Sequence, residues 1–184
     1  MEDKDQLFIN KPPKPINRAF IFWDHANIFH NLQELSVRID YDLVKRRLGR
    51  NYHVAAAIMY VGTPNYVFSK KKRFFRALDH IGWLIAEKPL KIDPSGKRSQ
   101  QGVDEKMFLD IYDLAKNEAY EKAIIVSGDN VFIEVIRELK EADIEVDVWS
   151  FRKSLSRMLI WEVGKEHIFF LDDILEEIKL VSIN

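Results

Sequence analysis

Three aspartates stand where a folded chain could bring their carboxylates together. Asp24 comes directly after the apolar run 19–23, and Asp129 lies two residues past the apolar run 123–127. Asp104 begins a helical pattern after a polar loop. In an open α/β sheet the functional crevice lies beyond the carboxyl ends of the strands, so all three are expected at one edge. Clustered carboxylates repel one another unless a cation joins them, and Mg²⁺ prefers oxygen ligands. The pattern therefore indicates a Mg²⁺ or Mn²⁺ site for phosphoryl chemistry.

Each aspartate also has a simpler structural explanation. Aspartate is a favoured N-cap residue, and all three stand at expected helix starts. For any one of them capping is the more frequent role, whereas the coincidence of three shifts the balance toward a site. From the spacing alone, both interpretations stay open.

The elements that must position these carboxylates alternate regularly from residue 18 onward. Strands are expected at 19–23, 54–61, 83–87, 123–127 and 144–149, with 167–171 as a short sixth strand. Helices are expected at 27–35, 42–48, 67–80, 104–117, 130–141 and 172–180. Most of the strand runs are nearly continuous in apolar residues, as in parallel strands that are covered on both faces. The alternation predicts an α/β fold with an open, mostly parallel sheet of five or six strands.

The 184 residues suit a single domain. Three prolines among residues 1–17 predict an extended N-terminal arm, which leaves 18–184 as the domain, and the polar stretch 91–102 is its one long loop. The absence of cysteine excludes disulfides and thiol catalysis. The acidic, polar start does not resemble a signal peptide, and no apolar run is long enough for a membrane helix, so a cytoplasmic protein is expected.

Three segments, in order, resemble the NYN domain family of the PIN-like nuclease superfamily, and most of all its LabA-like branch. They are FWDHANIFHNL (22–32), GVDEKMFLDI (102–111) and IIVSGDNVF (124–132), and the likeness extends from Arg18 to about Leu175. The resemblance implies a Rossmann-like, three-layer PIN-like domain with a metal-dependent ribonuclease site. It implies that Mg²⁺ or Mn²⁺ is held, directly or through water, by the aspartates of a catalytic set made up of Asp24, Asp104, Asp129 and Asn27.

Two departures from the family pattern bear on catalysis. Gln101 stands where lysine is usual, and Val131 replaces the second aspartate of the third motif. An apolar side chain cannot replace a carboxylate, so a metal site here has one ligand fewer. A one-metal nuclease and a domain that keeps the groove but has lost most of its turnover both stay open.

Four polar residues have secondary expected roles. Asn27 could orient a carboxylate or a phosphate oxygen, or be an ordinary first-turn residue. Ser127 could bond near the phosphate or cap a helix, and Asn130 could supply a water-mediated contact. Asp110 lies six residues after Asp104, about 240° around an ideal helix. It faces the site only if Asp104 precedes the helix.

Histidines and aromatic residues near these motifs are better explained structurally. His25 and His30 have no paired acid or nucleophile at a suitable spacing, so a structural or surface role is expected. Four aromatic residues could stack on bases, although core positions explain them better: Tyr60, Phe68, Trp83 and Trp149.

The formal net charge of −1 conceals an uneven distribution. Residues 43–103 carry 13 Lys and Arg against three acidic residues, a net of +10, whereas 1–42 and 104–184 carry −2 and −9. A basic rim beside an acidic cleft suits a polyanion, so RNA, mostly single-stranded, is the expected partner. Individual lysines could equally form a solvated helix face. The RNA-binding candidates are Lys70, Lys71, Lys72, Arg73, Arg76, Lys88, Lys91, Lys97 and Arg98.

The leading hypothesis is a Mg²⁺- or Mn²⁺-dependent endoribonuclease. The rival is a regulatory module that binds RNA or a protein without useful cleavage, and it is motivated by Val131 and Gln101. A phosphohydrolase for small molecules fits less well with the long basic segment. The last helix could close the core or pair with a second copy, so a homo-oligomer stays open.

Overall fold

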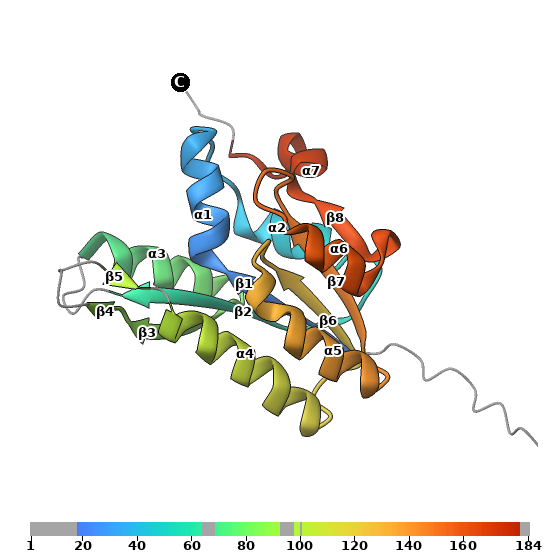
Figure 1. Ribbon diagram of the computed structural model, residues 1–184. Helices are drawn as coiled ribbons and strands as arrows, with labels where there is room; N and C mark the ends of the chain where they lie inside the picture. The colour runs from blue at the N-terminus through green and yellow to red at the C-terminus, as the bar shows by residue number, and fades with distance from the viewer. Residues whose placement is uncertain (1–17, 64–68, 93–97, 100, 181–184) are drawn as a thin grey trace, which may run out of the picture.

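The computed structural model describes residues 18–63, 69–92, 98–99 and 101–180. At its centre lies a six-stranded sheet in the order β3-β2-β1-β6-β7-β8, in which every neighbouring pair is parallel (Figure 1). These strands are β1 (Ala19–Asp24), β2 (Val54–Thr63), β3 (Leu84–Pro89), β6 (Lys122–Val126), β7 (Glu145–Ser150) and β8 (Ile168–Phe170). The predicted α/β fold is confirmed, and the short sixth strand is present.

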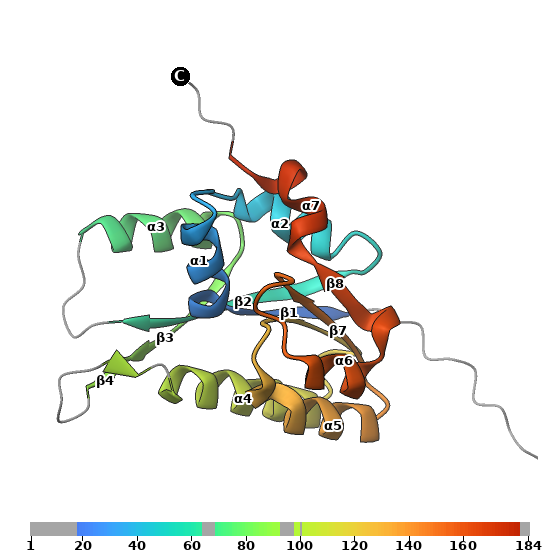
Figure 2. The same ribbon diagram turned by 45° about the horizontal axis from the view of Figure 1, so that its top comes forward.

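Helices cover both faces of the sheet and produce three layers (Figure 2). One face is covered by α1 (His25–Glu34), α2 (Tyr41–Leu48), α3 (Ser69–His80) and α7 (Leu171–Ile178). The other is covered by α4 (Gln101–Lys116), α5 (Ile133–Glu141) and α6 (Arg157–Val163). The layered Rossmann-like arrangement fits a PIN-like domain.

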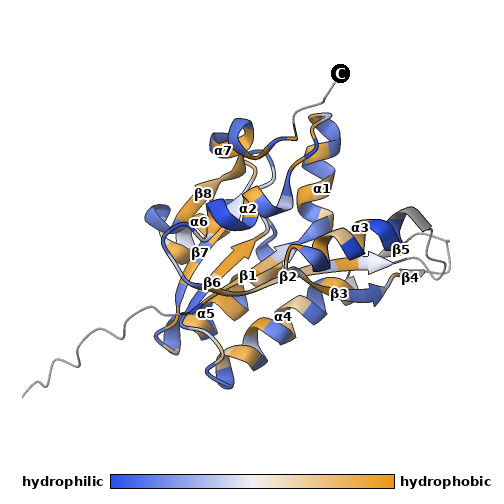
Figure 3. Cartoon of the chain, turned by 180° about the vertical axis from the view of Figure 1, so that it is seen from behind, coloured by the Kyte–Doolittle hydropathy of each residue, from blue (hydrophilic) through white to orange (hydrophobic). Residues whose placement is uncertain are grey.

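The apolar strands explain why the sheet is covered on both sides. Phe22 and Trp23 are neighbours in β1 and are both fully buried, yet they belong to different core clusters. Successive side chains of a strand point to opposite faces, so a continuous apolar run needs two covering layers. Figure 3 shows the strands mostly hydrophobic and the helices hydrophilic on part of their surface.

The order of the strands places three carboxyl ends side by side. β1 pairs with β2 on one side and with β6 on the other. Asp24, the last residue of β1, lies opposite Tyr60 of β2, and its neighbour Trp23 lies opposite Val126 of β6. The strand order reverses at this point, and ligands of open α/β sheets bind in such a crevice.

The structure differs from the predicted boundaries at several helix starts. α1 begins at His25 because Asp24 is its N-cap, and α4 begins three residues before Asp104. The predicted helix 130–141 is divided into a 3₁₀ turn, η1 (Asn130–Phe132), and α5.

Some short elements lie in segments that were not predicted to be ordered. Helix α6 and the 3₁₀ turn η2 (Lys165–His167) connect β7 to β8. The polar stretch 91–102 contains the antiparallel pair β4 (Lys91–Ile92) and β5 (Arg98–Ser99), as well as the start of α4. These elements are too short to carry a recognisable hydrophobic period.

The chain ends bear on two further expectations. The predicted arm 1–17 lies outside the described residues. Helix α7 buries Leu171, Ile174 and Ile178 in the core cluster that it shares with α1 and α2, so it closes the core. No helix in the described part of the chain is long and apolar enough to cross a membrane.

Candidate active site

Asp24 combines two roles at the end of β1. Its Oδ1 accepts a hydrogen bond from the backbone N–H of Asn27 at 3.2 Å, which caps α1. Its Oδ2 accepts the hydroxyl proton of Ser127 at 2.8 Å. The residue is only 5% exposed. Capping and site formation, which the sequence left as alternatives, are therefore compatible, because each uses a different oxygen of the same carboxylate.

Ser127 connects the ends of two neighbouring strands. It follows β6 directly and is fully buried. Its hydroxyl donates to Asp24 and accepts the backbone N–H of Asp129 at 3.2 Å. It therefore fixes the Asp24 carboxylate relative to the loop that carries Asp129, a positioning role that the sequence did not reveal.

Asn27 holds the same loop from α1. Its side-chain oxygen accepts the backbone N–H of Gly128 at 3.2 Å. A Cβ at residue 128 would lie 2.3 Å from the backbone oxygen of Ser154 and 2.6 Å from Oγ of Ser150, so only glycine fits here. The side-chain oxygen of Asn27 thus holds the loop after β6, and its expected role of orienting a carboxylate or a phosphate oxygen stays a prediction.

Asp24, Asp104 and Asp129 lie close enough for charge interactions to shift the pKa of Asp24 and of Asp104. Burial is the main cause that raises the pKa of Asp24, and the charge of Asp129 adds to it. Burial, followed by the charges of Asp24 and Asp129, raises the pKa of Asp104 to about 6. The groups that shift Asp104 also include Glu105, so all of the charges that act on it are acidic. The charges of Asp24 and Asp129 therefore disfavour the ionised form of Asp104, and a cation would offset this effect.

Asp129 and the two residues that follow it in the chain lie on the exposed side of the candidate site. Asp129 is exposed, and its Oδ1 caps η1 by accepting the backbone N–H of Val131 at 3.1 Å. Val131 is 43% exposed, and Asn130 is exposed as well. The valine therefore occupies a surface position where the family pattern has an acid, and the core does not require its apolar side chain.

Asp104 lies in the first turn of α4 and not before it. Asp110 therefore lies about 240° further around the same helix, which removes the condition under which it was expected to face the site. It forms an ion pair with Lys106. Its charge, after burial, contributes to the raised pKa of Tyr60, whose buried hydroxyl has no hydrogen-bond partner among the described residues. Asp110 is placed beside Tyr60.

The donor set fits a divalent cation that retains much of its water. Among the residues that the structure describes, no three His, Asp or Glu side chains stand close enough to enclose a metal ion. Mg²⁺ is commonly bound by one or two carboxylates with water completing the shell. Asp129 raises the pKa of Asp24, and both raise the pKa of Asp104, so these three carboxylates are the residues that would provide such a partial shell.

The basic candidates divide into exposed and engaged side chains. Lys72, Arg73, Arg76 and Lys88 are exposed. Lys71 is half-buried and donates to the backbone oxygen of Gly62 at 2.9 Å. The side chains of Lys70, Lys91 and Arg98, and the whole of Lys97, lie outside the described part of the structure.

The basic residues of α2 have structural partners. Lys45 donates to the backbone oxygen of Ile81, while Arg46 and Arg47 pair with Asp42 and Glu177. Part of the excess positive charge in 43–103 therefore stabilises the fold.

Most of the histidines and aromatic residues occupy the surface or core positions that the sequence favoured for them. His30 is exposed and pairs with Glu34 at 3.4 Å. Tyr60 and Trp83 are buried. Trp149 is half-buried and stacks on Phe169 with ring centroids 5.0 Å apart, and Phe68 lies outside the described residues.

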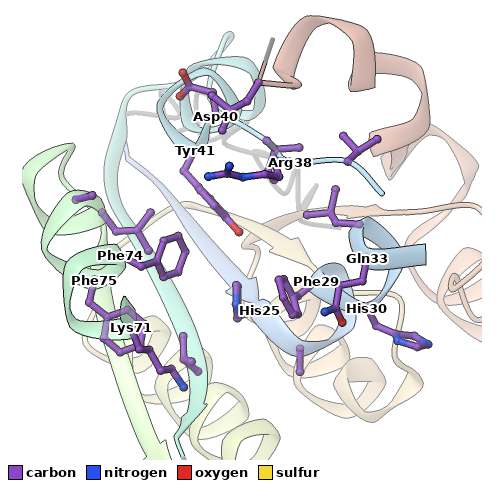
Figure 4. Close-up of a pocket in the computed structure, with 18 of the residues that line it drawn as sticks. His25, Phe29, His30, Gln33, Arg38, Asp40, Tyr41, Lys71, Phe74 and Phe75 are labelled. Atoms are coloured by element: carbon purple, nitrogen blue, oxygen red, sulfur yellow. The ribbon is translucent and has the colours of Figure 1, made fainter. Parts of the chain in front are cut away.

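Sequence reasoning missed a cavity between α1 and α3 (Figure 4). Its lining includes His25, in which burial and then the charge of Lys71 lower the pKa to about 4. The available signal was Phe29, an aromatic residue on a helix face that the core does not use; it is 44% exposed.

Comparisons with known proteins agree with this arrangement. A crystal structure of a protein of unknown function from Vibrio parahaemolyticus RIMD 2210633 is similar, with a TM-score of 0.68 and 18% sequence identity. The alignment covers 89% of this chain and 96% of that one, and at this identity it establishes the fold. No curated protein matches the chain significantly. The sequence profile of the NYN domain matches residues 18–170, and the chain therefore belongs to the NYN domain family.

Proposed function

We propose that the protein is a Mg²⁺- or Mn²⁺-dependent ribonuclease that cuts single-stranded RNA, and that it belongs to the LabA-like branch of its family. NYN domains are PIN-like nucleases, in general dependent on divalent metal and RNA-binding. The observation that carries the proposal is the electrostatic coupling of Asp24, Asp104 and Asp129 at the strand-order switch. Helix capping explains Asp24 and Asp129 individually, but carboxylates that disfavour one another's ionisation cost stability unless a cation joins them, and this supports phosphodiester hydrolysis at a metal site.

Each residue has a defined task in this proposal. Asp24, Asp104 and Asp129 hold the metal, partly through water. When bound, such an ion polarises the scissile phosphate and lowers the pKa of an attacking water. Ser127 holds the Asp24 carboxylate in place by its 2.8 Å hydrogen bond, and Asn27 fixes the adjoining loop at Gly128. Ser127 and Asn27 are therefore positioning residues, which act on the Asp24 carboxylate and on the loop at Gly128.

The RNA backbone is expected to follow the exposed cations. Lys72, Arg73 and Arg76 lie on α3, and Lys88 lies near the carboxyl end of β3. β3 is two strands from β1, at whose end Asp24 stands. Lysine and arginine contacts to phosphates release counterions, so binding must weaken as salt rises.

The test is cleavage of an end-labelled single-stranded RNA under titration with Mg²⁺ and Mn²⁺. Wild type should cleave only with metal, while Asp24→Asn and Asp129→Asn should abolish cleavage. Asp113→Asn is the matched control, because Asp113 is exposed on the same helix as Asp104 and is expected to leave cleavage intact. Cleavage in EDTA, or full activity in both site variants, would contradict the proposal.

A second candidate is a module that binds RNA without cutting it. Val131 favours it, because this exposed side chain leaves the site with one carboxylate fewer than the family pattern. This candidate requires salt-sensitive binding that is indifferent to EDTA and weakened by neutralising Lys72 and Arg73. Rapid metal-dependent turnover by the wild type would exclude it.

A further inference from the structure

A cavity of about 1040 Å³ lies between α1, α3 and the segment 36–41 (Figure 4). His25 and Ala26, the first residues of α1, line it, as do Val61 and Gly62 at the end of β2. Asp24 caps the same helix from the preceding position. The cavity therefore begins beside the first turn of the helix that Asp24 caps, on the side of α3.

Aromatic rings form two facing walls of this cavity. On the α1 side, Phe29 and His25 stack with centroids 5.2 Å apart and an interplanar angle of 23°. On the α3 side, Phe74 lies 5.9 Å from the His25 ring and 5.6 Å from the Tyr41 ring. Figure 4 shows Phe74 and Phe75 across the cavity from Phe29. The His25 ring thus contacts both Phe29 and Phe74, and the aromatic side chains of α1 and α3 together form a lining on which a flat aromatic ligand can pack.

One polar atom in the lining lacks a partner. Nδ1 of His25 is buried and has no hydrogen-bond partner among the described residues. Because this atom has almost no accessible surface, a ligand in the cavity would contact the rest of the imidazole ring and not Nδ1.

The rim of the cavity is basic. Lys71 lines it, with Nζ 5.5 Å from the centre of the Phe75 ring, and exposed Arg38 lines it from the other side. Asp40, an acid in the lining, is already engaged, because its Oδ1 accepts the backbone N–H groups of Asp42 and Leu43. Positive charge around an apolar, aromatic interior matches a nucleotide, whose base is flat and whose backbone is anionic.

We propose that this cavity is a nucleobase subsite, which receives a base of the RNA strand adjacent to the phosphate held at the carboxylates. The inference rests on the proposed function for the identity of the strand. The base packs on the aromatic lining formed by Phe29, His25 and Phe74, while its phosphates face Lys71 and Arg38. The volume of about 1040 Å³ lies just above the range of small-molecule pockets, about 300 to 1,000 Å³, so it is ample for one base.

The test is RNA binding without cleavage, measured by fluorescence anisotropy in EDTA. The probes are labelled oligouridine, labelled oligoadenosine and an abasic ribose-phosphate oligomer of the same length and charge. Wild type should bind the base-bearing probes more tightly than the abasic one. Phe29→Ala should weaken the base-bearing probes about tenfold and leave the abasic probe unchanged, since base stacking on an aromatic side chain contributes on that order.

Two further variants show whether the effect of Phe29→Ala is specific to the cavity. Trp161→Ala removes an aromatic ring that is 86% exposed on α6, and it should leave all three probes unchanged. Phe74→Leu keeps the apolar volume but removes the ring, and should reproduce the selective loss. Equal weakening of all probes by Phe29→Ala, no weakening, or equal wild-type affinity for abasic and base-bearing probes would overturn the subsite.

Failure of this inference and failure of the nuclease proposal have different outcomes. Metal-dependent cleavage together with a Phe29→Ala protein that binds all probes like wild type refutes only the subsite. Selective loss of base-bearing probes together with no cleavage refutes only the enzyme and leaves the subsite in a binding module.

Discussion

The hydroxyl of Ser127 donates a hydrogen bond to Oδ2 of Asp24 at 2.8 Å, and both residues are buried. The two lie 103 positions apart in the chain. This contact joins the ends of β1 and β6, the two strands between which the order of the sheet reverses. The Asp24 carboxylate therefore has its orientation set by a neighbour from a distant part of the sequence.

Replacing Ser127 with alanine should weaken both stability and metal binding. The Asp24 oxygen would lose its donor and the backbone N–H of Asp129 its acceptor, inside a buried site. Leaving such groups unpaired costs about 1–3 kcal/mol in the free energy of unfolding. Urea unfolding in EDTA measures this loss, and a Mg²⁺ titration measures the metal affinity. Unchanged values in both would show that the contact has no positioning role.

The stability of the metal-free protein should fall as the pH rises through about 6. The folded pKa of Asp104 is about 6, above the unfolded value of about 3.9, so the native state binds more protons between these values. Its contribution is fully present below the unfolded pKa and lost as the pH passes the folded one. Asp104→Asn should flatten the dependence and be more stable than wild type at pH 8.

Urea unfolding in EDTA over this pH range is the measurement for Asp104. Asp113→Asn, in the same helix but exposed, should retain the wild-type slope. Added Mg²⁺ should reduce the fall of the wild type, because a cation offsets the repulsion. A wild-type protein whose stability is flat between pH 4 and 7 would contradict the expectation.

Val131→Asp should restore the acid of the family pattern at little structural cost. Val131 is 43% exposed, so the change creates no cavity in the core. A further carboxylate beside Asp129 should raise the Mg²⁺ affinity about tenfold and increase cleavage at low metal concentration. Val131→Asn is the control of equal shape without charge, and an equal gain in both variants would remove the electrostatic explanation.

A buried ionic network at the other end of the sheet should govern stability without affecting the site. Lys122 begins β6 and is 1% exposed; its Nζ lies 2.7 Å from Oδ1 of Asp147. Asp147 also accepts the Tyr52 hydroxyl at 3.1 Å and contacts His167 at 3.0 Å. Lys122→Met leaves the aspartate without its cation and should cost about 3–5 kcal/mol in the free energy of unfolding.

The double variant Lys122→Met with Asp147→Leu tests the cause of that cost. Replacing both charges by apolar groups should recover most of the stability, because no unpaired buried charge remains. Urea unfolding of the single and double variants makes the comparison. A single variant that loses less than about 1 kcal/mol would contradict burial of the pair as the cause.

The sequence predicted those features that local pattern determines. Apolar runs such as 123–127 specify strands that are covered on both faces, and aspartates after them specify the edge at which the site lies. The hydrogen bond between Ser127 and Asp24 could not be predicted from the sequence, because it depends on which strands become neighbours in the sheet. The contact between Asn27 and Gly128 was missed for the same reason, since Gly128 belongs to the loop after β6.

Features without a periodic signal were also missed. Helix α6 is seven residues long, which is too short for its apolar positions to define a period. The start of α4 was placed at Asp104 because aspartate is a frequent cap, whereas the helix already begins at Gln101. The aromatic cavity arises from two helices, α1 and α3, whose contact no local pattern encodes.

The central place of β1 also governs when the carboxylates assemble during synthesis. β1 is among the first segments of the domain to leave the ribosome, yet one of its two partners in the sheet, β6, follows about a hundred residues later. Pairing between distant segments pays a large loop-closure entropy and comes late in folding. A nascent chain that ends before residue 127 already contains Asp24 and Asp104 but lacks both Ser127 and Asp129, so the three carboxylates come together only after β6 and the loop that follows it have been made.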